Sequence, residues 1–377
     1  MQNENKSRIL DTLQGKETAG IPIWGPNIME HSVLELLDGS GRRYVDDPYG
    51  VYIGALQKIG VDMVDQFIPT NPLSMGAGGY DGPSGEHNAP DSGIVLDGIT
   101  IDSPEAVAEH MEAVLIPSIE AKIRDFSEGE IVGRVVEDES MAQQMLGPSI
   151  QKLGYGHLVF PTLEYFRYGY VNYFMAYAIY PEIIDRLFAA QADYAVLHNR
   201  AAVKAYLSTG RPLYTRLDHD MADSRGLLVS LSSLERSWLG SFRRSIEPAV
   251  EAGFRLLWHC DGNLMQLLPR LIECGVNGFQ GFQYEDGMDY EKICAWKDRD
   301  GGDLVIIGGI SVTRELPMGT PADVKRQLEF LVEHGPRNGL ILGFSSSCAP
   351  GTPVENILTA VEGLQYYQKY GRLKGWQ

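Results

Sequence analysis

The segment His259-Cys260-Asp261-Gly262 brings together the side chains best suited to chemistry in this sequence. It follows a short apolar run, which predicts a β-strand, and side chains two residues apart in a strand share a face. His259 and Asp261 would therefore point the same way, while Cys260 points away. With a thiolate arriving from Cys348, they would offer nitrogen, oxygen and sulfur donors, a set suited to Zn2+. Such a set leaves one coordination position open for substrate, as in catalytic zinc sites.

The residue types alone leave a simpler explanation open. A histidine at a strand end commonly makes an ordinary hydrogen bond, and a lone cysteine such as Cys348 commonly packs as a small buried hydrophobe. The segment therefore predicts either a metal site or a polar strand end, and other features of the chain must decide between them.

Acidic side chains follow two other apolar runs and would converge on the same region. Glu137 and Glu139 follow one valine-rich run, and Asp218 and Asp220 follow another. We expect the acid that protonates a leaving group among Glu137, Glu139, Asp220 and Glu164. Asp218 is expected to contact the substrate or to hold a ligand by a hydrogen bond. For each carboxylate, a solvated loop position is the alternative.

Aromatic residues are unusually dense between residues 155 and 180. Tyr165 and Tyr168 in this stretch are expected to contact a flat aromatic substrate. An aromatic-rich helix that simply packs on the rest of the protein is the alternative.

Short apolar runs, rich in β-branched residues, alternate with longer amphipathic stretches along the chain. The runs are too short for helices and are mostly bounded by glycine, proline or a charge, which predicts strands. Predicted strands cover residues 21–25, 61–67, 131–137, 212–218, 254–259, 276–280, 304–309 and 339–344. Predicted helices cover residues 104–126, 181–207, 232–252, 264–275, 320–335 and 352–371.

About eight such alternations favour an α/β fold, a single (β/α)8 TIM barrel over residues 1–377. Active sites of such barrels lie at the carboxyl ends of the strands, where the residues named above would meet. No glycine-rich dinucleotide fingerprint follows the first predicted strand, which argues against doubly wound sheets. An irregular stretch from residue 68 to about residue 100 is expected to be a functional loop over the barrel mouth, with a disordered insertion as the alternative.

Composition narrows the class of partner. The formal net charge of -18 argues against nucleic acid, because phosphate binding needs clustered lysine and arginine. The amino-terminal residues lack the apolar core of a signal peptide, and no apolar run approaches the roughly 18 residues that a membrane helix needs. The 4 cysteines lack the spacing of a disulfide scaffold. We therefore expect a cytoplasmic protein with no membrane partner.

Three segments of the chain resemble the uroporphyrinogen decarboxylase superfamily. They are SRILDTLQGKETAGIPIWG near the start, LLWHCDGNLMQLLPRLIECGVNGFQGFQ, and GTPADVKRQLEFLVEHGPRNGLILGFSSSCAPGTPVENI. The resemblance runs over nearly the whole chain and is most specific in its second half. It implies a (β/α)8 barrel, in agreement with the predicted alternation of strands and helices.

This superfamily contains two chemistries. Its decarboxylases use no metal and bind a porphyrinogen through an arginine-rich amino-terminal segment, whereas here the first predicted strand runs into IWGPNIMEH. Its cobalamin-linked methyltransferases hold zinc through a His-x-Cys-Gly motif and a later cysteine. By that resemblance His259 matches the histidine, Cys348 matches the later cysteine, and Asp261 replaces the first cysteine. The replacement makes the site harder and better suited to an oxygen ligand than to a thiol.

The resemblance therefore implies a zinc-dependent methyltransferase. It would move a methyl group from a small methylated substrate, such as a methoxylated aromatic, to the cobalamin of a separate corrinoid protein, as in the methyl-transferring component of an O-demethylase. A metal-free decarboxylase and a non-catalytic protein that binds a corrinoid protein are the alternatives. A homodimer stays open.

Overall fold

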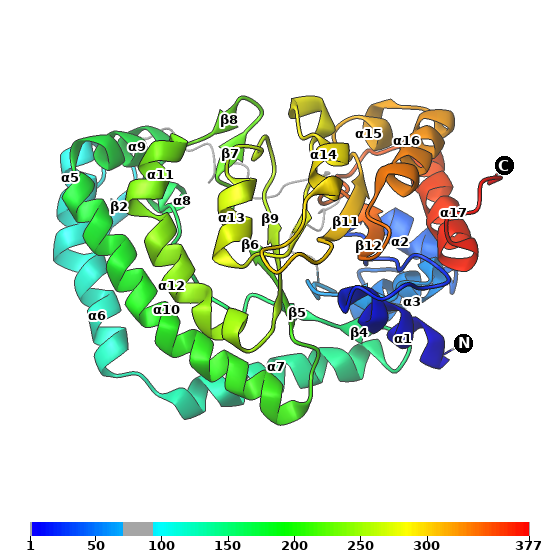
Figure 1. Cartoon of the computed structure of the whole chain (residues 1–377), viewed down its shortest axis with the longest axis horizontal. Helices are drawn as coiled ribbons and strands as arrows, with labels where there is room; N and C mark the ends of the chain where they lie inside the picture. The colour runs from blue at the N-terminus through cyan, green and yellow to red at the C-terminus, as the bar shows by residue number, and fades with distance from the viewer. Residues whose placement is uncertain (1, 71–92, 377) are drawn as a thin grey trace.

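The central feature of the fold is a curled parallel β-sheet wrapped by helices (Figure 1). A computed structural model describes residues 2–70 and 93–376, with side chains from residue 7 onward. The sheet has 6 strands in the order β12-β11-β10-β9-β6-β5. These strands are β5 (Gly154–Tyr155), β6 (Tyr214–Asp218), β9 (Arg255–His259), β10 (Gly278–Gln280), β11 (Val305–Ile310) and β12 (Leu340–Phe344).

Short parallel pairings continue from both edges of this sheet. Beside β12, Leu342 forms a parallel bridge with Ile23, and the next residue, Trp24, bridges to Met63. Met63 belongs to β1 (Met63–Val64), which pairs in parallel with β4 (Gln151–Lys152), just before β5. The curled sheet and its outer helices form a TIM-like fold.

Helices cover the outside of the sheet. In Figure 1, α10 and α12 run side by side to the left of the strands, and α7 crosses below them. The helices are α1 (Gln2–Leu13), α2 (His31–Asp38), α3 (Pro48–Ile59), α5 (Pro104–His110), η1 (Met111–Leu115), α6 (Ile116–Arg124), α7 (Glu128–Leu146), α8 (Tyr165–Tyr168), α9 (Tyr170–Ile179), α10 (Pro181–Thr209), α11 (Leu231–Ser237), α12 (Leu239–Glu251), α13 (Leu268–Cys274), η2 (Tyr284–Asp286), α14 (Tyr290–Ala295), α15 (Glu315–Met318), α16 (Pro321–His334) and α17 (Val354–Tyr370). Within residues 2–70 and 93–376, none of them is long and apolar enough to cross a membrane.

The last five predicted strands are confirmed by β6, β9, β10, β11 and β12. The predictions at 21–25 and 61–67 shrink to the bridging residues around Ile23 and to the short strand β1. The strand predicted at 131–137 is wrong, because these residues lie inside α7. Along α7 the buried residues recur every three or four positions, for example Ile131 and Val135, which is the period of a helix packed on one face.

This error also displaces a predicted acid. Glu137 was expected at the end of a strand, but it lies on the exposed face of α7. The third strand position of the sheet is taken instead by β4 and β5, whose polar sequence from Gln151 to Tyr155 carries little apolar periodicity.

The expected irregular loop is only partly described. Residues 71–92 lie outside the described residues, whereas residues 95–100 form the antiparallel hairpin of β2 (Val95–Leu96) and β3 (Ile99–Thr100). Asp97 and Gly98 form its turn with φ of 50° and 83°, the positive values that a tight hairpin requires. The extension of an irregular loop to residue 100 is therefore wrong.

Side chains inside the curled sheet form a separate core that fixes where polar residues can point. This core contains Ile9, Leu13, Trp24, Met63, Leu153, Tyr214, Leu257, Val305, Ile307 and Ile341. Because alternate residues of a strand share a face, Leu257 inside the sheet directs His259 to the same interior. By the same rule Tyr214 directs Arg216 inward, and Asp218 follows at the strand end.

A buried charged cluster joins α7 to the sheet. The Glu139 Oε1 atom lies 2.8 Å from Lys152 Nζ and 3.2 Å from His157 Nε2, and it accepts a hydrogen bond of 3.2 Å from the Tyr206 hydroxyl. Burial alone would raise the pKa of Glu139, but the hydrogen bond from His157 and the charge of Lys152 outweigh it and lower that pKa. Glu139 is thus bound into this cluster, which removes it as a free acid for catalysis.

Replacing Glu139 with glutamine should lower the free energy of unfolding by about 3 kcal/mol near pH 7, because Lys152 then stays buried without its counter-charge. Since the folded protein lowers the pKa of Glu139, this stabilisation is complete above the usual glutamate pKa and is lost as the pH falls through the lowered value. Urea denaturation of the wild type and Glu139→Gln at pH 7 and about pH 4 measures both effects. Glu137→Gln, on the exposed face of the same helix, is the control; an equal loss in both variants would contradict the prediction.

Candidate active site

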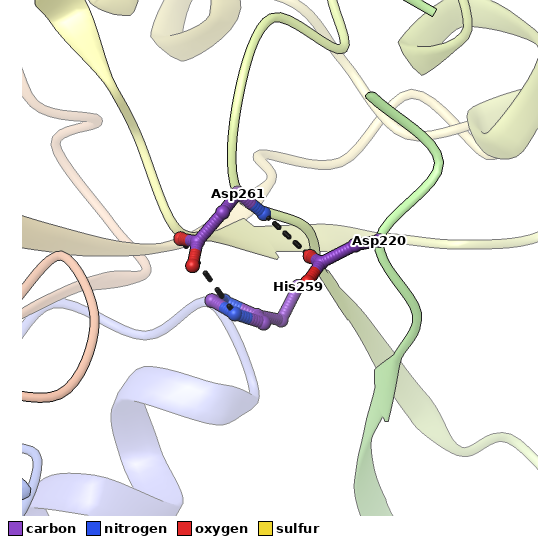
Figure 2. Close-up of side chains that lie close together, drawn as sticks. All are labelled: Asp220, His259 and Asp261. Carbon is purple, nitrogen blue, oxygen red and sulfur yellow. Dashed lines mark hydrogen bonds and ion pairs between the residues drawn. The ribbon is translucent and has the colours of Figure 1, made fainter. Parts of the chain in front are cut away.

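The register between β6 and β9 brings together two pairs of polar side chains. Asp218 of β6 lies directly opposite His259 of β9 in the parallel ladder. Beyond these residues, the backbone N–H of Asp261 donates a hydrogen bond of 2.9 Å to Asp220 Oδ1 (Figure 2). The two strands therefore present Asp218 and Asp220 beside His259 and Asp261 at the carboxyl edge of the sheet.

Three of these residues form a compact cluster. One ligand atom from each of Asp220, His259 and Asp261 lies within 4.8 Å of the other two. Figure 2 shows the carboxylate of Asp261 pointing toward the imidazole of His259. His259 Nε2 lies 3.9 Å from Asp261 Oδ1 and 4.0 Å from Asp218 Oδ1, and both distances are too long for hydrogen bonds.

The donor set fits a divalent metal ion. His259 is only 7% exposed, and among the described residues neither His259 Nδ1 nor the buried Asp261 Oδ1 has a hydrogen-bond partner. A buried polar atom without a partner is costly, and a cation between Asp261 and His259 would relieve that cost at the carboxylate. Imidazole nitrogen and carboxylate oxygen are both established zinc ligands.

Burial raises the pKa of Asp220, and the neighbouring carboxylates of Asp261 and Asp218 raise it further against the opposing charge of His259. Three carboxylates crowd around one imidazole at this edge of the sheet. Their mutual repulsion favours a bound proton or a bound cation in the folded protein.

Cys348, predicted as the third ligand, is not part of the cluster that the structure forms from the described residues. Its thiol is buried beside Thr352, and burial raises the pKa of Cys348 to about 11. The loop after β12 nevertheless reaches the cluster, because the Ser346 hydroxyl donates a hydrogen bond of 3.4 Å to Asp261 Oδ2. In the structure it is Asp220, predicted from the sequence as an acid, that joins His259 and Asp261 in the cluster.

Two neighbouring side chains have structural partners instead. Cys260 is buried and its sulfur accepts a hydrogen bond of 3.3 Å from the Met221 N–H, so it points away from the cluster as strand geometry predicts. His219 is also buried, and its Nε2 accepts a hydrogen bond of 2.9 Å from the Leu163 N–H. Burial lowers the pKa of His219 to about 4, which keeps this ring neutral and fixes the segment that leads into α8.

A cavity of about 730 Å³ opens beside the cluster, within the size range of small-molecule sites. Asp220 and Asp261 line one side of it, and Tyr165, Tyr170 and Phe174 line another. The Tyr165 and Tyr170 rings lie 4.7 Å apart, centroid to centroid. The antiparallel hairpin of β7 (Ala222–Asp223) and β8 (Gly226–Leu227) completes the wall, together with Gln283.

Of the side chains predicted to bind substrate, Tyr165 lines this cavity and its hydroxyl donates a hydrogen bond of 2.8 Å to the Asp220 carbonyl. Tyr168 is fully buried, and its hydroxyl lies 2.9 Å from His110 Nδ1, away from the cavity lining. Glu164 accepts a hydrogen bond of 2.8 Å from Gln191 and forms an ion pair with Arg167 at 3.2 Å. Among the acids predicted from the sequence, the structure therefore brings only Asp220 into the cluster.

Gly281 is a residue of the site that sequence reasoning missed. Its φ is +91°, and a Cβ atom built there would lie 2.6 Å from His259 Nδ1. Only glycine combines this backbone conformation with room for the imidazole. The glycine directly after the strand pattern VNGFQ was the available signal, because such a position commonly marks a close approach.

Comparison with known proteins adds information about the fold. No protein-family model matches the sequence, and no curated protein matches it. A solved structure of a methyltransferase from Methanosarcina mazei aligns over 96% of this chain and 98% of its own, with a TM-score of 0.57 and 14% sequence identity. A protein assigned as a vitamin-B12-independent methionine synthase of Listeria monocytogenes aligns over 62% of this chain and 66% of its own, with a TM-score of 0.37 and 16% identity, which is too weak to carry an argument. This chain is thus similar to the methyltransferase in fold over nearly its whole length.

Gly281→Ala should displace the imidazole of His259. If zinc binds at this cluster, its affinity should fall by at least about tenfold, because the orientation of a ligating side chain controls metal affinity. Gly287→Ala is the matched control: its φ is +96°, but the nearest atom to its Cβ would be the side-chain nitrogen of Asn263 at 3.0 Å. Both variants should lose similar stability from backbone strain. Zinc titration of the two purified variants should therefore separate them, and equal affinities would contradict the assigned role of Gly281.

Proposed function

We propose that this chain is a zinc-dependent methyltransferase of the uroporphyrinogen decarboxylase superfamily and that it forms a single domain. The proposal rests mainly on the cluster of Asp220, His259 and Asp261, because both of its carboxylates also line the adjacent cavity. Full-length similarity in fold to a solved methyltransferase supports it. The parallel bridges that link Ile23 and Trp24 to the neighbouring strands support a complete (β/α)8 barrel.

Asp220, His259 and Asp261 would hold the zinc ion. Zinc supplies Lewis acidity, which stabilises negative charge on the oxygen that loses the methyl group. Two hydrogen bonds within the chain hold Asp220 in place. The Asp261 N–H donates to the Asp220 carboxylate, and the Tyr165 hydroxyl donates to the Asp220 backbone carbonyl. A donor set of one nitrogen and carboxylate oxygens is hard, and it suits an oxygen-bound methyl donor better than a thiol.

The cavity would bind the methylated substrate. Tyr170 and Phe174 offer ring faces for a flat aromatic molecule, which supports a methoxylated aromatic donor. The rim is open to solvent, since Tyr170 is 47% exposed and the Arg225 side chain is 88% exposed. A corrinoid protein that docks at this rim would bring its cobalamin to the methyl group, and the chain would then act as the methyl-transferring component of an O-demethylase.

The metal assignment predicts about one zinc ion per chain in the purified protein and close to none in His259→Ala, because the variant removes the only nitrogen donor of the cluster. Elemental analysis of both proteins, beside Cys348→Ala, measures this. With Asp220, His259 and Asp261 as the proposed ligands, Cys348→Ala should keep its zinc. Loss of zinc from Cys348→Ala would return sulfur to the ligand set, and a wild type without zinc would refute the proposed cofactor.

Methyl transfer is the direct test of activity. Wild-type protein should form methylcobalamin from cob(I)alamin with methoxylated aromatics, in a panel that also contains methylamines and methanol. Phe174→Ala should raise KM for the aromatic donor roughly tenfold while Val171→Ala, on an exposed part of α9 outside the cavity lining, leaves it unchanged. Silence of the wild type across the whole panel would contradict the proposed reaction.

A further inference from the structure

Arg216 and Asp65 form a buried ion pair close to the candidate metal cluster. Arg216 of β6 precedes Asp218 by two residues, and its Nε atom lies 2.9 Å from the Asp65 carboxylate that follows β1. Arg216 is 4% exposed and Asp65 is 1% exposed. The indole N–H of Trp24 donates a further hydrogen bond of 2.9 Å to Asp65. Asp65 thereby anchors the guanidinium in one position inside the curled sheet.

Such a pair adds little stability by itself, because desolvation of two charges offsets their attraction. What it does provide is a fixed set of N–H groups. Arg216 Nη1 lies 3.5 Å from Asp218 Oδ2 and 3.3 Å from Gln280 Oε1. The Tyr155 ring covers the guanidinium at 4.7 Å, and its hydroxyl donates a hydrogen bond of 2.9 Å to the same Asp218 oxygen.

These contacts give the two carboxylate oxygens of Asp218 different surroundings. Oδ2 is held by Tyr155 and faces Arg216, so Oδ1 is directed toward His259 Nε2 at 4.0 Å. Asp261 Oδ1 lies at nearly the same distance from that nitrogen, 3.9 Å. Two ligands of one tetrahedral zinc ion are about 3.4 Å apart, given bonds of about 2.0–2.2 Å. Asp218 Oδ1 thus lies about half an ångström beyond this spacing from His259 Nε2. Asp218 is not part of the group whose ligand atoms all lie within 4.8 Å of one another, so its carboxylate would have to move further to share one ion with Asp220 and Asp261.

We infer that Asp218 is a further zinc ligand and that Arg216 and Tyr155 are positioning residues that aim it. The inference rests on the proposed function, because it concerns the same metal. It also indicates which side of the metal would be open to substrate. Asp220 and Asp261 line the cavity, whereas Asp218 is not among the residues of that lining. The Asp218 side chain, which is 31% exposed, would bind the metal from outside the cavity lining and leave the cavity side open for substrate.

Arg216 is poorly placed to bind an anionic substrate itself. Its Nε and Nη1 atoms face Asp65, Asp218 and Gln280, and Nη2 donates a hydrogen bond of 3.3 Å to Gln66. The ring of Tyr155 covers one face of the guanidinium. The side chain is thus engaged by protein groups on several sides, which agrees with a positioning role.

Zinc affinity, measured by competition with a chromogenic chelator, tests the inference. Asp218→Asn should weaken zinc binding by at least about 100-fold, and Tyr155→Phe by about 10- to 100-fold, the usual effect of losing a hydrogen bond to a ligand. Tyr214→Phe is the matched control, because the Tyr214 hydroxyl donates a hydrogen bond of 3.3 Å to Asp65 and not to Asp218. It should bind zinc like the wild type. The visible spectrum of the Co2+-substituted protein should change in Asp218→Asn, since a carboxylate leaves the coordination sphere.

The outcomes separate this inference from the proposal on which it rests. Wild-type zinc affinity in Asp218→Asn, together with loss of zinc from His259→Ala, would overturn the inference and leave the proposed metal site intact. A wild type that binds no zinc would overturn both. Equal weakening in Tyr155→Phe and Tyr214→Phe would show a general structural effect and would overturn the positioning role of Tyr155.

Discussion

The candidate site depends on one interaction, the hydrogen-bonded register between β6 and β9. Because Asp218 lies opposite His259, the residues two positions further along, Asp220 and Asp261, also meet. Side chains in a strand alternate between faces, so a slip of one residue would turn one of these pairs to the outer helices. The register is fixed from below by buried apolar residues such as Leu257, which pack inside the curled sheet. The same strand register therefore determines both the packing of the core and the placement of the polar cluster.

Residues that follow two other strands, Gly281 and Asp65, also shape the candidate site. After β10, Gly281 omits a side chain and so admits the imidazole of His259. After β1, Asp65 holds Arg216 across the interior of the sheet. The first contact follows from the parallel pairing of β9 with β10. The second joins the short β1–β4 pairing to β6 of the 6-stranded sheet. The site is thus a property of the whole sheet and does not belong to one segment.

This explains how much the sequence could predict. The later strands are compact apolar runs with clear ends, so β9 and the shared face of His259 and Asp261 follow from strand periodicity alone. The run at 131–137 misleads, because its valines suit a strand while their wider spacing serves the buried face of α7. That Asp220 lies beside His259 and Asp261 depends on distances between strands, which a single sequence does not contain. Arg216 acts through contacts across the sheet, and its residue type alone does not show them. For Gly281 the glycine after a predicted strand was a signal of a close approach, but the sequence does not say to which residue.

The absence of sulfur from the cluster formed by the described residues bears on which methyl donor the site could use. Carboxylates donate negative charge to a bound divalent ion, and with Asp218 included they would more than neutralise it. A metal in such a site stabilises a developing oxyanion less than one held by neutral ligands alone. The leaving group must then carry more of its own negative charge. A phenolate does so by delocalisation into its ring, whereas a simple alkoxide does not. The aromatic wall of Tyr170 and Phe174 beside the cluster and the charge of the cluster thus both support the donor proposed above, an aryl methyl ether.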